Sequence, residues 1–307
     1  MTLPGGRRIF LKQDSLKDGS LLQREASVLA ALSADGSSQL GPRLIDFDCA
    51  QRLLITELVE GYAPLDRQFR RTLLADPAAA TAAALALVKL HGHSPDIQGI
   101  AGQLRFPLAR IEPLTPEEVA ARPGGYLEFA AVLYQLREVI EELASRWRSS
   151  HFIHGDFKVD NVLVRVDPRL KARPPIVIVD WEMAGMGDPM WDIGSFVGSA
   201  LVAWLETLAP AAGPEELASR DANPIRRQIG YFLLTYRHLG PGVFGPAQSF
   251  AITAMQYAGI FMLHRVLVRL EISGSMDGVT PLLLAFARNL LSCPERAVEA
   301  LLGGALR

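Results

Sequence analysis

The chain has 307 residues, of which 49% are hydrophobic and 21% are charged, and its formal net charge is −2. This near-neutral balance excludes the strongly basic surface typical of proteins that bind nucleic acid or an anionic membrane. At this length we expect one or two domains with a substantial core. The N-terminus lacks the basic-then-apolar order of a secretory signal, so we expect a cytoplasmic protein.

The two cysteines, Cys49 and Cys293, match no disulfide framework and no metal-ligand spacing. We expect both to be small buried residues in a reducing compartment. The most apolar segment, residues 254–270, contains His264, Arg265 and Arg269. A membrane-spanning helix is therefore not expected there.

The first sixty residues combine strands with one helix. Residues 9–13 read as a short strand, and residues 21–32 have apolar positions at helical spacing. Residues 44–48 and 53–59 read as two antiparallel strands joined by a short turn. We expect a small strand-rich N-terminal lobe at residues 1–60, with a hinge between Glu57 and Gly61.

From residue 61 to residue 307 the pattern is mainly helical. Asp76-Pro77 provides an N-cap followed by a proline at the first helical position. The proline-containing segment 94–125 is expected to be a loop-rich connection. The expected helices of this larger lobe are residues 77–90, 126–148 and 189–208, followed by about three more after a second loop at 209–224. The fold class expected is α+β with two lobes.

The segment from His154 to Asn161 carries the most information about chemistry. Its spacing H-x-D-x-x-x-x-N is typical of the catalytic loop of kinases, in which Asp156 would accept a hydroxyl proton and Asn161 would hold magnesium. Residues 162–166 and 175–179 read as two strands separated by a turn, and Asp180 follows the second. This hairpin should bring Asn161 and Asp180 together as two oxygen ligands of one hard cation.

These residues, with Asp180-Trp181-Glu182 and the segment Gly-Asp-Pro-x-Trp-Asp at 187–192, resemble the aminoglycoside phosphotransferase and choline-kinase-like families. The resemblance covers roughly residues 7–270. It implies a bilobal protein-kinase-like fold with ATP in the cleft between the lobes. Asp156 matches the catalytic aspartate of these families, and Asn161 and Asp180 match their magnesium ligands.

The resemblance also assigns residues to the nucleotide. Lys12 matches the lysine that binds the α- and β-phosphates, and Glu25 matches the carboxylate that orients it. The alternative for both is a solvated side chain on an ordinary strand or helix. Glu57 to Val59 match the hinge, whose backbone would meet the adenine edge.

Other matching residues are expected to be architectural. His154 and Asp192 resemble a structural pair that holds the catalytic loop through hydrogen bonds to backbone groups. His91 is expected to pack at the end of its helix. Lys158 either contacts the transferred phosphate and offsets its charge, or is a solvent-facing loop lysine.

One part of the pattern differs from these families, which carry a phosphate-covering hairpin before the lysine. Eleven residues precede Lys12, whereas a strand, loop and returning strand need about twenty at about 3.3 Å per strand residue. We therefore expect a truncated lobe without that hairpin, or an obligate partner protein that supplies it. This trimmed pattern resembles the phosphotransferases that act with lyases in class V lanthipeptide and thioamitide biosynthesis.

The expected function is an ATP- and Mg²⁺-dependent phosphotransferase acting on a hydroxyl. A Ser or Thr of a precursor peptide is favoured over an amino sugar or amino alcohol, and the choice between ATP and GTP stays open. A cationic small acceptor could be held by the acidic residues Asp96, Glu182, Asp188 and those in 112–118, unless these are ordinary solvated charges. The remaining alternative is a pseudokinase that binds a partner protein without turnover.

Overall fold

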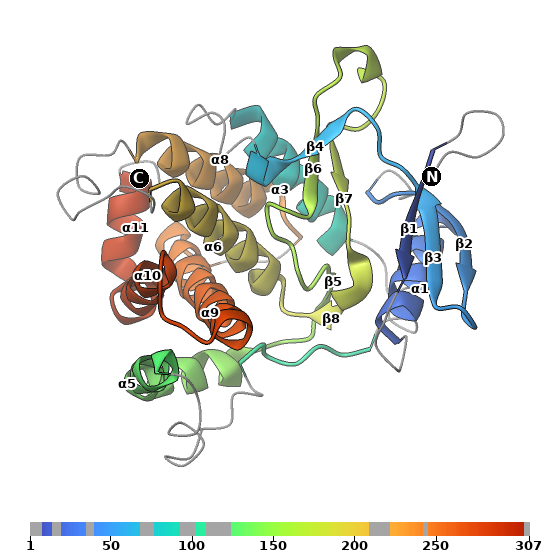
Figure 1. The fold of residues 1–307 in the computed structure, drawn as a ribbon. Coiled ribbons are helices and arrows are strands. Elements are labelled where there is room, and N and C mark those ends of the chain that lie inside the picture. Colours follow the sequence, from blue (N-terminus) through green and yellow to red (C-terminus); the bar gives the residue numbers. More distant parts are fainter. Residues whose placement is uncertain are drawn as a thin grey trace.

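The computed structural model describes residues 8–13, 20–34, 40–67, 77–92, 102–108, 124–208, 222–241 and 245–303. A small sheet with one helix lies at one end of the molecule, and a larger group of helices lies at the other (Figure 1). Short strands from the middle of the chain lie between these two parts. The α+β class and the larger helical part agree with the sequence prediction.

The small sheet has the strand order β1-β3-β2 and is antiparallel throughout. Its elements are β1 (Ile9–Gln13), α1 (Ser20–Ala34), β2 (Leu44–Asp48) and β3 (Leu53–Glu57). All four were predicted from periodicity, although β3 ends at Glu57 rather than at Val59. The N–H of Leu58 still donates to the carbonyl of Arg8, one residue beyond the last paired position, Ile9 with Glu57.

Helix α1 connects the small sheet to the rest of the molecule. On one side Leu22 and Ala26 pack with Leu54 of β3 in a small cluster. Toward the C-terminal end of α1, the large core of the helical part includes Val28, Leu29 and Leu32. The helix therefore fixes the position of any side chain that it presents to the cleft.

Two small sheets carry the central loops. The first has the order β4-β6-β7, and the second pairs β5 with β8. Their bounds are β4 (Tyr62–Pro64), β5 (His151–Ile153), β6 (Val162–Arg165), β7 (Ile176–Ile178) and β8 (Gly185–Gly187). The hairpin of β6 and β7 was predicted, whereas the three-residue strands β4, β5 and β8 are too short to show a period.

The helical part follows the predicted order closely. Its helices are α3 (Pro77–His91), α5 (Gly125–Arg146), α6 (Pro189–Leu208), α8 (Asn223–Leu239), α9 (Ala247–Ser273), α10 (Thr280–Ser292) and α11 (Pro294–Leu302). The predicted N-cap Asp76 and most of the predicted loop 94–125 lie outside the described residues.

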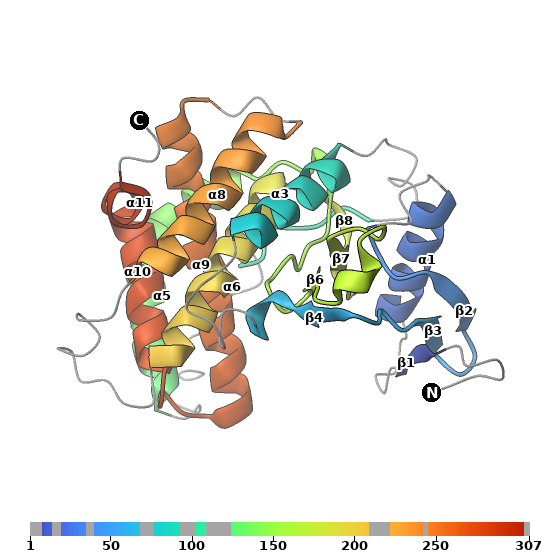
Figure 2. The ribbon, with the colours of Figure 1, turned by 90° about the horizontal axis from the view of Figure 1, so that it is seen from above.

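Helix α9 is long and apolar enough to cross a membrane by composition alone. In this fold it is a core helix that packs against α6 and α10 (Figure 2). Two glycines of α6 allow this close packing. A Cβ on Gly194 would lie 2.3 Å from the Cβ of Tyr257, and one on Gly198 would lie 2.8 Å from the Phe261 ring. The α6–α9 contact is therefore set by the absence of side chains at these two positions.

The expectation for the cysteines is wrong. Cys49 lies in the turn between β2 and β3, and Cys293 joins α10 to α11. Both are free thiols exposed to solvent. Their small size suits a turn and a helix junction, where no core is available to cover them.

Candidate active site

The catalytic-loop segment begins with a turn that requires glycine. Gly155 has a φ of +79°, and a Cβ there would lie 2.2 Å from the carbonyl oxygen of Met183. On either side, His154 is fully buried and its two ring nitrogens are both used: Nε2 donates to the carbonyl of Val179 (3.1 Å), and Nδ1 accepts from the N–H of Asp156 (3.3 Å). The side chain thus links the loop to the end of β7.

Asp192, in the first turn of α6, holds the same loop from below. Its Oδ2 accepts from the N–H of His154 (2.7 Å) and its Oδ1 from the N–H of Gly155 (2.9 Å). The Nε2 of His91 lies 3.1 Å from Oδ2, and the Nδ1 of His91 lies 2.6 Å from the hydroxyl of Tyr236. Asp192 is fully buried, so every one of these partners offsets the cost of burying its charge.

Asp156 projects from this loop with one carboxylate oxygen in two contacts. The Nζ of Lys158 lies 2.5 Å from Asp156 Oδ2, and the Nδ2 of Asn161 donates to the same oxygen (3.0 Å) and to the Asp156 carbonyl (2.9 Å). Lys158 is 20% exposed and faces Asp156, so it is not a solvent-facing loop lysine. Among the described residues, no donor reaches the amide oxygen of Asn161.

Asp180 lies one strand away from Asn161. The N–H of Val179 donates to the carbonyl of Asn161 (2.9 Å), so the hairpin brings the two loop ends together at the backbone. Asp180 itself has a φ of +68°, a left-handed conformation that Asp tolerates better than most residues. This turn starts the short helix η3 (Trp181–Met183), which presents a further carboxylate, Glu182.

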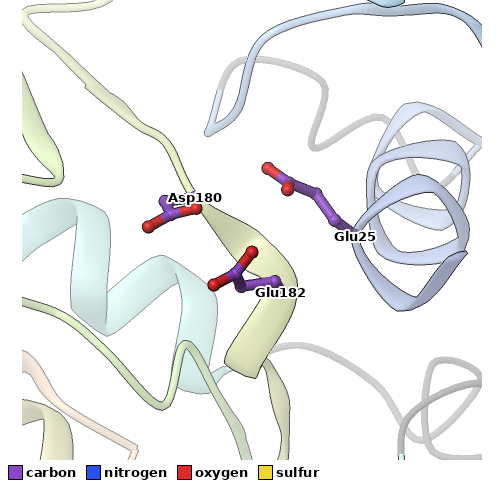
Figure 3. A group of neighbouring side chains, drawn as sticks. All are labelled: Glu25, Asp180 and Glu182. Atoms are coloured by element: carbon purple, nitrogen blue, oxygen red, sulfur yellow. The ribbon is translucent and has the colours of Figure 1, made fainter. Parts of the chain in front are cut away.

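Lys12 lies among three carboxylates (Figure 3 shows the three acids). Its Nζ lies 2.9 Å from Glu25 Oε2 and 2.7 Å from Glu182 Oε2, and it also contacts Asp180. Glu25 comes from α1, and its second oxygen accepts from the N–H of Trp181 (3.2 Å). The solvated alternative for Lys12 and Glu25 therefore does not hold, because Glu25 is 4% exposed and both side chains face the cleft.

The electrostatics of this cluster follow from burial and proximity. Burial alone would lower the pKa of Lys12, but the charge of Glu25 and the hydrogen bonds with Asp180 and Glu182 raise it strongly. Burial raises the pKa of Glu25, and the charge of Lys12 lowers it in part. The ammonium of Lys12 is thus held firmly in its charged form.

The same acids form a candidate divalent-cation site. One oxygen each from Glu25, Asp180 and Glu182 lies within 4.8 Å of the others. Carboxylate oxygens are the ligands that Mg²⁺ prefers, and a magnesium site in a kinase typically uses only one or two of them. The pair Asn161 and Asp180 stays a prediction for the metal, and the open amide oxygen of Asn161 agrees with it. Glu182, which was not predicted as a metal ligand, is a third carboxylate beside Asp180.

A cavity of about 370 Å³ lies beside this cluster, between the small sheet and the β6–β7 hairpin. Its polar end is formed by Lys12, Glu25 and Asp180, and its apolar walls are formed by Phe10, Pro42, Leu54, Leu58, Leu163 and Val179. The predicted hinge residues Glu57 and Val59 line its rim. Among the described residues, no acceptor takes the N–H of Val59, which leaves this group available to a flat heterocycle.

The acids predicted to hold a cationic acceptor do not form a second site in the described residues. Asp96 and the segment 112–118 lie outside them. Glu182 contacts Lys12, and Asp188 is 9% exposed and accepts from the N–H of Met190 (2.9 Å). Both carboxylates are thus already committed to contacts within the protein.

Three comparisons place this geometry among known proteins. The model of the family described as "Phosphotransferase enzyme family" matches residues 2–222. No curated protein matches the chain.

Solved structures resemble it at low identity. A choline/ethanolamine kinase family protein from Mesorhizobium loti is 19% identical with a TM-score of 0.55, covering 95% of this chain and 85% of its own. The choline kinase LicA from Streptococcus pneumoniae is 16% identical with a TM-score of 0.50, covering 93% and 86%. The GDP complex of aminoglycoside 2'-phosphotransferase-IIIa is 13% identical with a TM-score of 0.54, covering 94% and 86%. These neighbours confirm the kinase-like, bilobal fold.

Proposed function

The chain belongs to the phosphotransferase enzyme family, and from this membership we propose that it transfers a phosphoryl group from ATP to a hydroxyl, with Mg²⁺ as cofactor. The observation that carries the proposal is the cleft itself. A lysine held by a buried glutamate, two further carboxylates and an apolar cavity of about 370 Å³ meet at one place. Phosphoryl transfer needs this combination of charge and positioning more than covalent chemistry.

Each end of the cavity suits a different part of the nucleotide. The apolar walls and the open Val59 N–H suit the base, and Lys12 suits the α- and β-phosphates. One relative is described as a GDP complex, which supports a purine nucleotide in this fold. Asp180 and the open amide oxygen of Asn161 would hold Mg²⁺, which supplies charge neutralisation at the phosphates.

Asp156 would act on the acceptor hydroxyl. Its Oδ2 is held by Asn161 and Lys158, so the carboxylate has a fixed direction. A fixed carboxylate orients the hydroxyl and accepts its proton late in the transfer. The Nζ of Lys158 lies 2.5 Å from Asp156 Oδ2. From this position its charge would stabilise negative charge on the transferred phosphoryl group, without accepting a proton.

The proposed acceptor is a Ser or Thr hydroxyl of a peptide, in preference to an amino sugar or amino alcohol. Two of the acids that would hold an ammonium group, Glu182 and Asp188, are engaged within the protein. A lyase that eliminates the phosphate would be the expected partner enzyme, because elimination from phosphoserine requires a separate base. The chemistry at Asp156 is the same for either class of hydroxyl.

The test is transfer itself. With ATP, Mg²⁺ and a pool of serine peptides and small alcohols, the acceptor should gain the mass of one phosphate as ADP is released. Asp156→Asn should lower the rate by about 10³-fold while the variant still binds nucleotide. Nucleotide-dependent thermal stabilisation with and without Mg²⁺ separates this enzyme from a pseudokinase. If neither ATP nor GTP stabilises the wild type in the presence of Mg²⁺, the proposed function is wrong.

A further inference from the structure

A second, smaller cavity lies beside the catalytic loop and shares no lining residue with the nucleotide cleft. It measures about 30 Å³ and lies where α6 and α9 meet the loop. Buried side chains of Val202, Ala203 and Phe261 form its floor. Its rim carries four charged residues, Lys158, Asp160, Glu206 and Arg265. The space admits one small charged group, because each water-sized occupant needs about 10–15 Å³.

The cations of this rim are not equally engaged. The Nζ of Lys158 lies 2.5 Å from Asp156 Oδ2. The nearby carboxylate of Glu206 is paired with Arg269, which lies one turn beyond Arg265 on α9. Arg265 is half-buried, and in the part of the chain that the structure describes it forms no ion pair. Two carboxylates, Asp160 and Glu206, also line this cavity, but neither forms an ion pair with Arg265 among the described residues, and a guanidinium without an ion pair favours an anionic partner.

Charges on α9 and on the catalytic loop are close enough to influence each other. Partial enclosure lowers the pKa of His264, the neighbouring Arg265 lowers it further, and Asp156 raises it. Lys158 also contributes by lowering this pKa. Arg265 lines the same cavity as Lys158, so this part of α9 lies beside the catalytic loop.

We infer that this cavity binds an anionic group of the acceptor, a carboxylate or a phosphate, placed close to the hydroxyl that is phosphorylated. The inference rests on the proposed function and narrows its acceptor. Arg265 and Lys158 provide the positive charge, and the apolar floor excludes a large hydrated cation. Asp160 at the rim faces solvent and disfavours a second negative group. The source of the anionic group is either an acidic residue beside Ser or Thr in a peptide, or a small hydroxy acid or phosphorylated polyol.

The experiment uses acceptors matched in size and different in charge. Glycerate, glycerol and serinol form one series, with glycerol 3-phosphate added, and three serine peptides with Asp, Ala or Lys beside the serine form another. The rate of ADP release and the mass of the product give kcat/KM for each. We expect the anionic member of at least one series to exceed the neutral one by about tenfold, and the cationic member to be slowest. The responding series identifies the source.

Arg265→Gln should remove this preference by raising KM for the anionic acceptor about tenfold while leaving kcat for the neutral acceptor and the affinity for ATP unchanged. Arg265→Lys should retain part of the preference. Arg137→Gln, which alters an exposed arginine of α5, is the matched control and should change nothing.

The possible failures are distinguishable. Three results would overturn the inference while the proposed function stands. The enzyme could prefer the cationic acceptors, or Arg265→Gln could lose activity equally with all acceptors. The third result is an enzyme that binds nucleotide but does not discriminate among the acceptors, either in turnover or in calorimetric binding. Absence of Mg²⁺-dependent nucleotide binding in the wild type would overturn both.

Discussion

The two sides of the catalytic loop have opposite charge arrangements. On the nucleotide side one ammonium, Lys12, lies among three carboxylates. On the other side the carboxylate of Asp156 contacts Lys158, and the cavity beside Lys158 is lined by Arg265 of α9 together with Asp160 and Glu206. Coulomb interactions between unit charges at about 4 Å are worth about 4 kcal/mol near a protein surface, so such differences decide which ions each side admits. In our proposal the first side accepts a metal cation together with phosphates, and the second accepts an anion.

The largest expected effect on activity comes from one substitution on each side of the loop, Asp180→Asn and Asp156→Asn. Asp180→Asn removes a carboxylate from the nucleotide side but keeps a residue that adopts the left-handed conformation at φ +68°. We expect transfer to fall by about 10³-fold and the Mg²⁺ dependence of nucleotide binding to disappear. Asp156→Asn should lose a similar amount of activity and retain Mg²⁺-dependent nucleotide binding. Calorimetry with ATP, with and without Mg²⁺, measures the difference, and equal losses of binding in both variants would contradict the division.

The two lysines give the next, smaller test. Lys12→Met should raise KM for ATP by about tenfold to hundredfold, because a charge-assisted contact with phosphate is lost. Lys158→Met should instead lower kcat by a similar factor with KM for ATP unchanged. Steady-state kinetics at varied ATP separate these outcomes. A kcat effect in Lys12→Met with unchanged KM would show that Lys12 does not bind the nucleotide.

Lys12→Met also makes a prediction about stability and pH. Burial raises the pKa of Glu25, and Lys12 opposes that shift, so the pKa should rise further in the variant. A carboxyl whose folded pKa lies above its unfolded value stabilises the fold when protonated. The variant should therefore lose stability relative to the wild type as pH rises through the pKa of Glu25. Melting temperatures measured from acid to neutral pH test this sign.

The sequence predicted one side of the loop better than the other. Asp156 and Asp180 were assigned from the spacing of a motif that lies on predicted strands and turns, whereas Lys12 and Glu25 were assigned through the family resemblance that this motif supports. The hinge was located for the same reason, although β3 ends two residues earlier than expected.

The acceptor side depends on contacts between distant helices. Arg265 lies on a helix whose packing against α6 is set by two glycines, and no spacing in the sequence relates it to Lys158. The sequence suggested Glu182 as a ligand of a cationic acceptor or as a solvated charge. Its contact with Lys12 was not predicted, because the short helix η3 that turns it toward Lys12 has too few residues to show a pattern.

The smallest effect concerns two buried carboxyls, Glu25 and Asp188, which have raised pKa values for the same reason, burial. Glu25 is paired with Lys12, whereas Asp188 is held by the N–H groups of Met190 and Arg148 and by the hydroxyl of Tyr257. Because its folded pKa is raised, the charged form of Asp188 costs stability as pH rises through that value. Asp188→Asn should therefore change stability by only about 1 kcal/mol and flatten the pH dependence between acid and neutral conditions. Chemical denaturation across this range, beside the exposed control Asp46→Asn, measures the slope. An unchanged slope would mean that burial does not raise the pKa of Asp188.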